Sequence, residues 1–202
     1  MRKKLISLML CFFLISIMFS SLAYAGDEQN PEIQDKTGDA FGYIDIESVW
    51  FYEKQDEPDI MYISMKIFNS SETRFQQTFA VFWSFKNIKY AVSLHLGFSF
   101  DEWMQFNSGI YRRRSYSQIN GTYDFDTGVI NWKIPKTDIG NPEKGDVLTD
   151  TWSNAFRRLG FIGRIGFTRY ILDSIIFRIF GNNMWDYAPD KGTYGRNYTI
   201  EY

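Results

Sequence analysis

A strict alternation of apolar and polar side chains, repeated in several short segments, constrains the fold of this chain more than any other feature. In the clearest segment, 88–96, every second residue is apolar: Ile88, Tyr90, Val92, Leu94 and Leu96. Because successive side chains of an extended chain point to opposite faces, such a segment forms a strand that buries one side only. Similar alternation occurs within 61–67, 75–85 and 130–134.

Turn-forming residues separate these alternating segments. They gather at 69–71, 86–87, 120–121, 126–128, 140–142 and 145–146. The middle of the chain lacks the long helical patterns that a parallel α/β fold requires. The sequence therefore predicts a mostly β protein, an antiparallel β-sandwich of jelly-roll-like type, formed by a single domain over residues 43–202.

The first 25 residues have the pattern of a secretory signal peptide. Three cationic residues at 2–4 precede an apolar run over 5–22, and a small-x-small motif ends at Ala25. We expect cleavage after Ala25 and export to the cell surface or beyond. The apolar run also approaches the roughly 20 residues that span a bilayer, so an uncleaved anchor is the alternative. Residues 26–42 are polar and are predicted to form a loose N-terminal arm.

The composition of the mature chain excludes several kinds of chemistry. The only cysteine of the full sequence, Cys11, lies in the signal segment, so the mature chain has none. His95 is the only histidine. Cysteine–histidine arrangements and zinc sites of the histidine–cysteine type are therefore excluded, a Ser-His-Asp triad would have to use His95 itself, and we expect a solvated or hydrogen-bonded His95. Loss of the three signal cations takes the formal net charge from −2 to −5, which disfavours nucleic acid as a partner.

Acidic residues cluster near the start of the mature chain. Asp35, Asp39 and Asp45 flank Gly38 and Gly42. Carboxylates in a flexible glycine-containing loop can hold Ca²⁺, and loop capping with solubility is the alternative explanation, which is slightly preferred. Two further acidic groups are Asp124 with Asp126, for which a hairpin turn is the preferred explanation, and Asp186 with Asp190.

Exposed aromatic and cationic residues are the candidates for ligand binding, since a flat ring matches the C–H face of a sugar. Trp103 and Trp185 have polar neighbours and are the best placed tryptophans, whereas Trp83 and Trp132 alternate with core residues and should be buried. An anionic polysaccharide could also be held by Tyr111, Arg112 and Arg114. A solvated edge strand is the simpler explanation of these arginines.

Residues 156–180 depart from the strand pattern. They contain five arginines and a single acid, and the apolar spacing over 169–180 predicts a short amphipathic helix. This insertion could dock on a membrane or a partner, or it could cover an open end of the sandwich core.

Three stretches resemble known proteins. The opening Asp35-x-x-Gly38-Asp39, followed by residues 43–46, resembles DOMON-like domains and the ninth family of carbohydrate-binding modules, and residues 128–146 are similar to a later stretch of the same group. The ending over 187–200 resembles that of secreted archaeal proteins. This resemblance implies a jelly-roll-like sandwich, a structural Ca²⁺ near Asp35, Asp39 and Asp45, and binding in place of catalysis.

The sequence thus favours an exported, non-catalytic binding domain for a cell-surface glycan. An envelope or interaction protein that docks through the arginine-rich insertion is the first alternative. A glycan hydrolase that uses two carboxylates is the third hypothesis.

Overall fold

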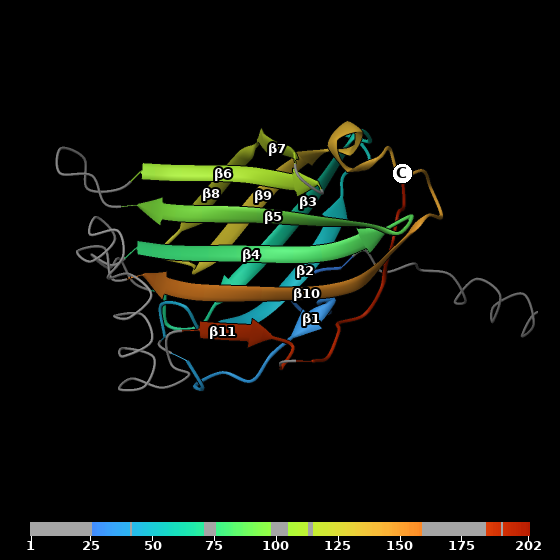
Figure 1. Ribbon diagram of the computed structural model, residues 1–202. Helices are drawn as coiled ribbons and strands as arrows, with labels where there is room; N and C mark the ends of the chain where they lie inside the picture. Colours follow the sequence, from blue (N-terminus) through green and yellow to red (C-terminus); the bar gives the residue numbers. More distant parts are fainter. Residues whose placement is uncertain are drawn as a thin grey trace, which may run out of the picture.

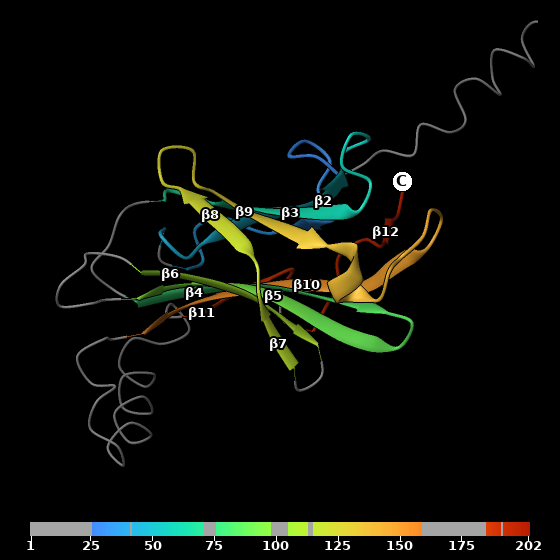
Figure 2. The ribbon, with the colours of Figure 1, turned by 90° about the horizontal axis from the view of Figure 1, so that it is seen from above.

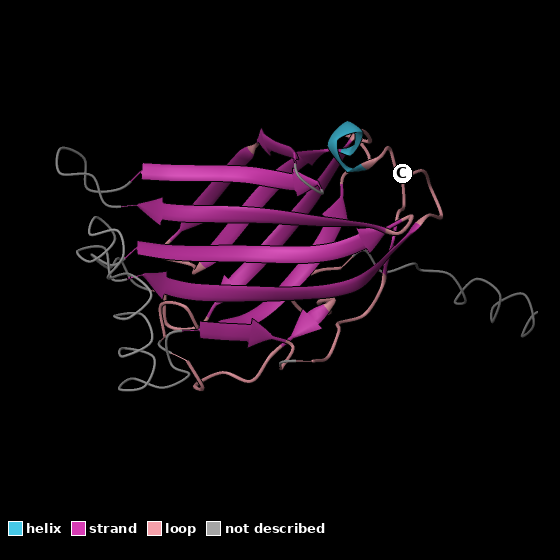
Figure 3. Cartoon of the chain, in the orientation of Figure 1, coloured by secondary structure: helices cyan, strands magenta, loops and turns pink. Residues whose placement is uncertain are grey.

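A computed structural model describes residues 26–40, 42–70, 76–97, 105–112, 115–158, 185–190 and 192–202. Figure 1 looks onto the outer face of one antiparallel sheet, and Figure 2 shows a second sheet packed against its inner face. Within the described residues the only helical element is the short 3₁₀ helix η1, Lys136–Ile139, drawn in cyan in Figure 3. The predicted antiparallel β-sandwich is therefore confirmed, and the predicted helix at 169–180 lies outside the described residues.

The first sheet has five strands in the spatial order β1-β2-β3-β9-β8. Their bounds are β1 Ile33–Gln34, β2 Ile46–Glu53, β3 Ile60–Ile67, β8 Asn120–Asp124 and β9 Val129–Pro135. The second sheet has seven strands in the order β11-β10-β4-β5-β6-β7, with β12 paired to β10. Their bounds are β4 Gln76–Phe85, β5 Ile88–Gly97, β6 Gln105–Arg112, β7 Ser115–Gln118, β10 Val147–Arg158, β11 Trp185–Ala188 and β12 Tyr198–Thr199.

The core lies between the two sheets and contains the alternating apolar residues that the sequence marks. On the apolar side of β5 Ile88 is partly buried and the other four residues are buried, and so are the inward residues of β9: Ile130, Trp132 and Ile134. Trp132 and Trp83 are 0 % and 1 % exposed, as predicted. Aromatic rings fill much of this space; Phe51 of β2 meets Trp83 of β4 edge to face, with ring centroids 6.1 Å apart.

Two of the predicted turns form tight hairpins, whereas a third does not form. Lys86 and Asn87 join β4 to β5 with φ of 48° and 61°, values that a type I′ turn requires. Gly128 ends the turn between β8 and β9 with φ of 73°. The predicted turn at 120–121 is wrong, because β8 begins at Asn120. Only Ile119 separates β7 from β8, and there the chain crosses from one sheet to the other (Figure 2).

The N-terminal arm is more ordered than predicted, because β1 within it pairs with β2. Ile33 lies opposite Val49 and is fully buried. The Phe51 N–H donates a 2.8 Å hydrogen bond to the Glu32 carboxylate, and the Arg196 N–H donates to the Glu32 carbonyl over 2.7 Å. The arm is therefore held between β2 and the C-terminal segment 192–202.

A buried ion pair attaches the chain end to the five-stranded sheet. Lys136 forms it with Glu53, whose side chain is fully buried. The same carboxylate accepts hydrogen bonds from the Tyr198 hydroxyl at 3.2 Å and from the Glu201 N–H at 2.6 Å. Burial raises the pKa of Tyr198, so its hydroxyl stays protonated and continues to donate.

We predict that Lys136→Met lowers the free energy of unfolding by about 3–5 kcal/mol, because it leaves the Glu53 carboxylate buried without a counter-charge. Chemical denaturation measures this change. Lys133→Met is the matched control, since Lys133 pairs with Glu57 in a half-exposed bridge that should contribute less than about 1 kcal/mol. Adding Glu53→Gln to Lys136→Met should restore part of the loss. Equal stability of the two single variants would contradict the prediction.

Candidate functional site

Three carboxylates meet where the loop between β1 and β2 passes the inner side of β11. One oxygen each from Asp35, Asp39 and Asp186 lies within 4.8 Å of the other two, and we call these residues the acidic cluster. Asp35 and Asp39 come from the predicted N-terminal group. Asp186 comes from the far end of the chain, where the sequence had grouped it with Asp190.

Backbone hydrogen bonds fix the orientation of Asp186. The Ile46 N–H donates to its Oδ2 over 2.5 Å, and the Tyr187 N–H donates to its Oδ1 over 2.8 Å. The residue is 4 % exposed, so the carboxylate is held rigidly at the edge of the core. The bond from Ile46 joins β11 of the seven-stranded sheet to the start of β2 in the five-stranded sheet.

Ionisation is energetically unfavourable for two carboxyl groups of the acidic cluster. Burial, reinforced by the charge of Asp186, raises the pKa of Asp35 to about 7. Burial is also the main reason why the pKa of Asp186 rises to about 6, and the charges of Asp39 and Asp45 act in the same direction. Close carboxylates that resist ionisation are the arrangement that a cation would stabilise, and oxygen ligands of this kind suit hard cations.

Asp45, the third residue of the predicted metal group, lies outside the acidic cluster. It is 1 % exposed, and its Oδ2 accepts a 2.6 Å hydrogen bond from the Gly38 N–H. Burial raises the pKa of its carboxyl. Asp45 therefore ties down the loop that carries Asp35 and Asp39, and the acidic cluster contains Asp186 where the sequence had placed Asp45.

A row of aromatic side chains covers part of the outer face of the seven-stranded sheet. We call it the aromatic row: Phe82 of β4, Trp152 and Phe156 of β10, and Trp185 and Tyr187 of β11. Phe82 and Trp152 stack with centroids 3.9 Å apart and planes 5° apart. Phe156 and Trp185 stack at 4.6 Å, and Tyr187 lies between the two pairs, 6.4 Å from Trp152 and 6.3 Å from Trp185.

The structure describes only some of the predicted ligand-binding residues, and it places one of them in the aromatic row. Trp185 is 39 % exposed and belongs to the aromatic row. Trp103, Arg114 and residues 159–180 of the predicted insertion lie outside the described residues. Tyr111 and Arg112 lie in β6, where they pair with Ala91 and Tyr90 of β5.

Of the aromatic row, only Trp185 was predicted from the sequence as a ligand-binding residue. Trp152 and Phe156 are four residues apart and therefore share one side of β10, and Trp185 and Tyr187 are two apart and share one side of β11. Aromatic residues on the outward side of paired strands are the signal that could have revealed it. His95 lies on the same outer face and, as expected, is hydrogen bonded: its Nδ1 lies 2.9 Å from the Thr78 hydroxyl and its Nε2 lies 3.1 Å from the Ser93 hydroxyl.

The fold and the site define an antiparallel β-sandwich with an edge cluster of carboxylates and an outer aromatic face. Comparison with known proteins finds no match: no family model, no curated protein and no solved structure is similar enough to this chain to be matched. The resemblance to carbohydrate-binding and DOMON-like domains therefore stays a prediction. Among the described residues, no helix has both the length and the apolar character needed to cross a bilayer.

We predict that, without metal, the protein gains stability as the pH falls. The folded-state pKa of Asp35 is about 7 against an ordinary value of 3.8, so the folded protein binds more protons between these values. The contribution of Asp35 to the free energy of unfolding is fully present below about pH 4 and is lost as the pH rises through 7. Asp35→Asn should flatten the stability profile between pH 5 and 8 by about 1–2 kcal/mol, allowing for partial exposure.

Thermal unfolding in a chelator at several pH values measures this profile. Asp126→Asn, in an exposed turn, is the matched control and should leave the profile unchanged. An identical profile for wild type and Asp35→Asn would contradict the prediction.

Proposed function

We propose that this protein is an exported, non-catalytic domain that binds glycan at or near the cell surface through the outer face of its seven-stranded sheet. The aromatic row is the observation that carries the proposal. Five aromatic side chains form a continuous apolar strip across three neighbouring strands, and Trp185 within it is 39 % exposed. Apolar ring surface beside polar side chains is the combination that suits sugars, which have apolar C–H faces and a rim of hydroxyl groups.

Polar groups border this strip in positions that complement sugar hydroxyls. Asn154 of β10 lies opposite Tyr187 in the β10–β11 pair, and its Oδ1 is buried without a hydrogen-bond partner among the described residues. A hydroxyl-bearing ligand would supply donors and acceptors to such groups, whereas a purely apolar ligand would not.

The proposal assigns Ca²⁺ to the acidic cluster. Its three carboxylates offer hard oxygen ligands, and the raised pKa values of Asp35 and Asp186 indicate that charge on these two groups is costly without a cation. Because Asp186 alternates with Trp185 and Tyr187 along β11, a cation bound on the inner side would also hold the aromatic row in place on the outer side.

We predict that Ca²⁺ raises the melting temperature of the protein at pH 7.5. Stabilisation should grow with Ca²⁺ concentration, reaching about 2–3 kcal/mol at roughly one hundred times the dissociation constant. Asp186→Asn and Asp39→Asn should abolish this response, and Asp126→Asn should keep it. Differential scanning calorimetry with and without Ca²⁺ makes the measurement. A melting temperature that Ca²⁺ leaves unchanged would remove the cation from the proposal.

A glycan array, run in Ca²⁺ and again in chelator, tests glycan binding directly. We expect a defined set of glycans to bind in Ca²⁺ and more weakly in chelator. Trp185→Ala should weaken that binding by about tenfold, the loss of one sugar–ring contact. Tyr202→Ala is the matched control, since Tyr202 is a comparably exposed aromatic residue, 41 % exposed, outside the aromatic row. An array without a binding glycan in either condition would refute the proposed function.

A further inference from the structure

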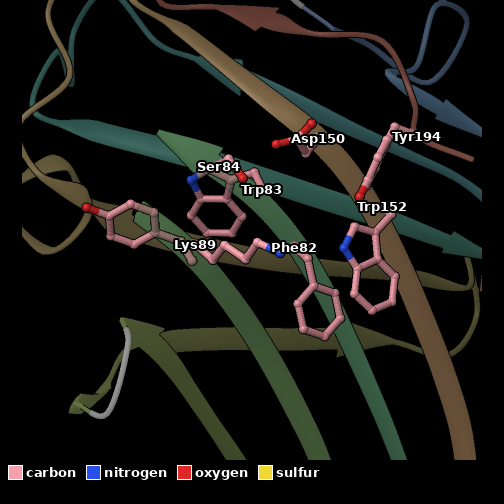
Figure 4. Close-up of a pocket in the computed structure, with 8 residues that line it drawn as sticks. Phe82, Trp83, Ser84, Lys89, Asp150, Trp152 and Tyr194 are labelled. Carbon is pink, nitrogen blue, oxygen red and sulfur yellow. The ribbon is translucent and has the colours of Figure 1, made fainter. Parts of the chain in front are cut away.

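A small pocket lies at one end of the aromatic row. Its volume is about 80 Å³, and Figure 4 shows its lining side chains. They include Phe82, Ser84, Lys89, Asp150, Trp152 and Tyr194. The stacked rings of Phe82 and Trp152 form one side, so the pocket opens directly from the aromatic row. Typical small-molecule pockets measure about 300–1,000 Å³, so this one accommodates part of a single ring.

The charged groups of the pocket are not used to hold the fold together. The side chains of Lys89 in β5 and Asp150 in β10 have no hydrogen bond or ion pair with any described residue. Tyr194 comes from the C-terminal segment and is 60 % exposed. These donors and acceptors surround an aromatic surface, and they remain available to a ligand.

The backbone at Asp150 is strained in a way that serves the pocket. Its φ is 52°, although it is not glycine, and the pairing of β10 with β4 shifts register between Thr149 and Trp152. Such a bulge changes the direction in which side chains point, and strain of this kind persists where the surrounding structure imposes it. At this bulge β10 contributes a carboxylate to the lining of the pocket.

We infer that this pocket binds the terminal sugar of the glycan, an uncharged pyranose whose ring packs against Trp152 and Phe82. This inference rests on the proposed function. Asp150 accepts hydrogen bonds from ring hydroxyls, Lys89 donates to them, and the Tyr194 hydroxyl does either. One carboxylate and one ammonium give the pocket no net charge, which favours a neutral sugar over an acidic one.

The position of Tyr194 indicates where one neighbouring sugar of the glycan lies. Tyr194 also lines a second, more open hollow of about 460 Å³ beside Gln29, Gln34 and Arg196. A sugar linked to the one in the first pocket can therefore pass Tyr194 into the second hollow, while the remainder of the glycan lies along the aromatic row. A disaccharide should for this reason bind more tightly than a single sugar.

Nuclear magnetic resonance of the purified protein in Ca²⁺ tests this inference. The indole N–H signal of Trp152, assigned with Trp152→Phe, is followed during titration with methyl glycosides of glucose, galactose, mannose and N-acetylglucosamine. Their β-linked disaccharides and glucuronic acid are titrated in the same way. We expect at least one neutral sugar to shift the Trp152 signal, its disaccharide to bind more tightly, and glucuronic acid to bind about tenfold more weakly.

Two variants examine the polar groups. Asp150→Asn removes the charge but keeps a residue that tolerates positive φ, and Tyr194→Ala truncates an exposed side chain; each should weaken binding by about tenfold. Asp126→Asn and Tyr202→Ala are the matched controls. Glycan binding that both pocket variants leave unchanged, or that leaves the Trp152 signal unmoved, would overturn this inference alone. Failure of every sugar and every array glycan to bind would overturn the proposed function with it.

Discussion

Burial of one apolar face of each sheet against the other is the interaction on which the remaining structure depends. Large aromatic rings fill the space, and this has a cost: the indole N–H groups of Trp83 and Trp132 have no acceptor among the described residues. An unpaired buried donor costs about 1–3 kcal/mol, which the apolar area of two fully buried indoles offsets. The core thereby fixes which side of every strand faces solvent, and so where polar and aromatic side chains can meet a ligand.

The strands could be predicted because their cause is local. Alternation with a period of two follows from the geometry of an extended chain, and it places residues 88–96 and 130–134 correctly without knowledge of their partners. Positive φ at Lys86 and Asn87 was likewise foreseeable from a two-residue turn between such strands. The pair Asn120-Gly121 was predicted to form a turn but begins a strand. The chain changes sheets just before it, and such a crossing requires flexible residues of the same kind as a turn does.

The sites were harder to predict, because their members meet only through tertiary structure. Asp35 and Asp39 are near in sequence and were identified together, whereas Asp186 joins them through the position of β11 beside the β1–β2 loop. The aromatic row draws on β4, β10 and β11, and nothing in a single strand shows which neighbours it will have. Asp150 could not be predicted at all, because the bulge that orients it is a property of the β10–β4 pairing.

β11 is a four-residue strand, and among the strands that the structure describes it pairs only with β10, at the end of the sheet. Short edge elements open locally at a lower free energy than the whole domain. Such an opening would remove Asp186 from the acidic cluster and, at the same time, Trp185 and Tyr187 from the aromatic row. The rest of the sandwich would stay folded. Amide hydrogen exchange in β11 would then report on the acidic cluster and the aromatic row together. Neither could be lost by this opening without the other.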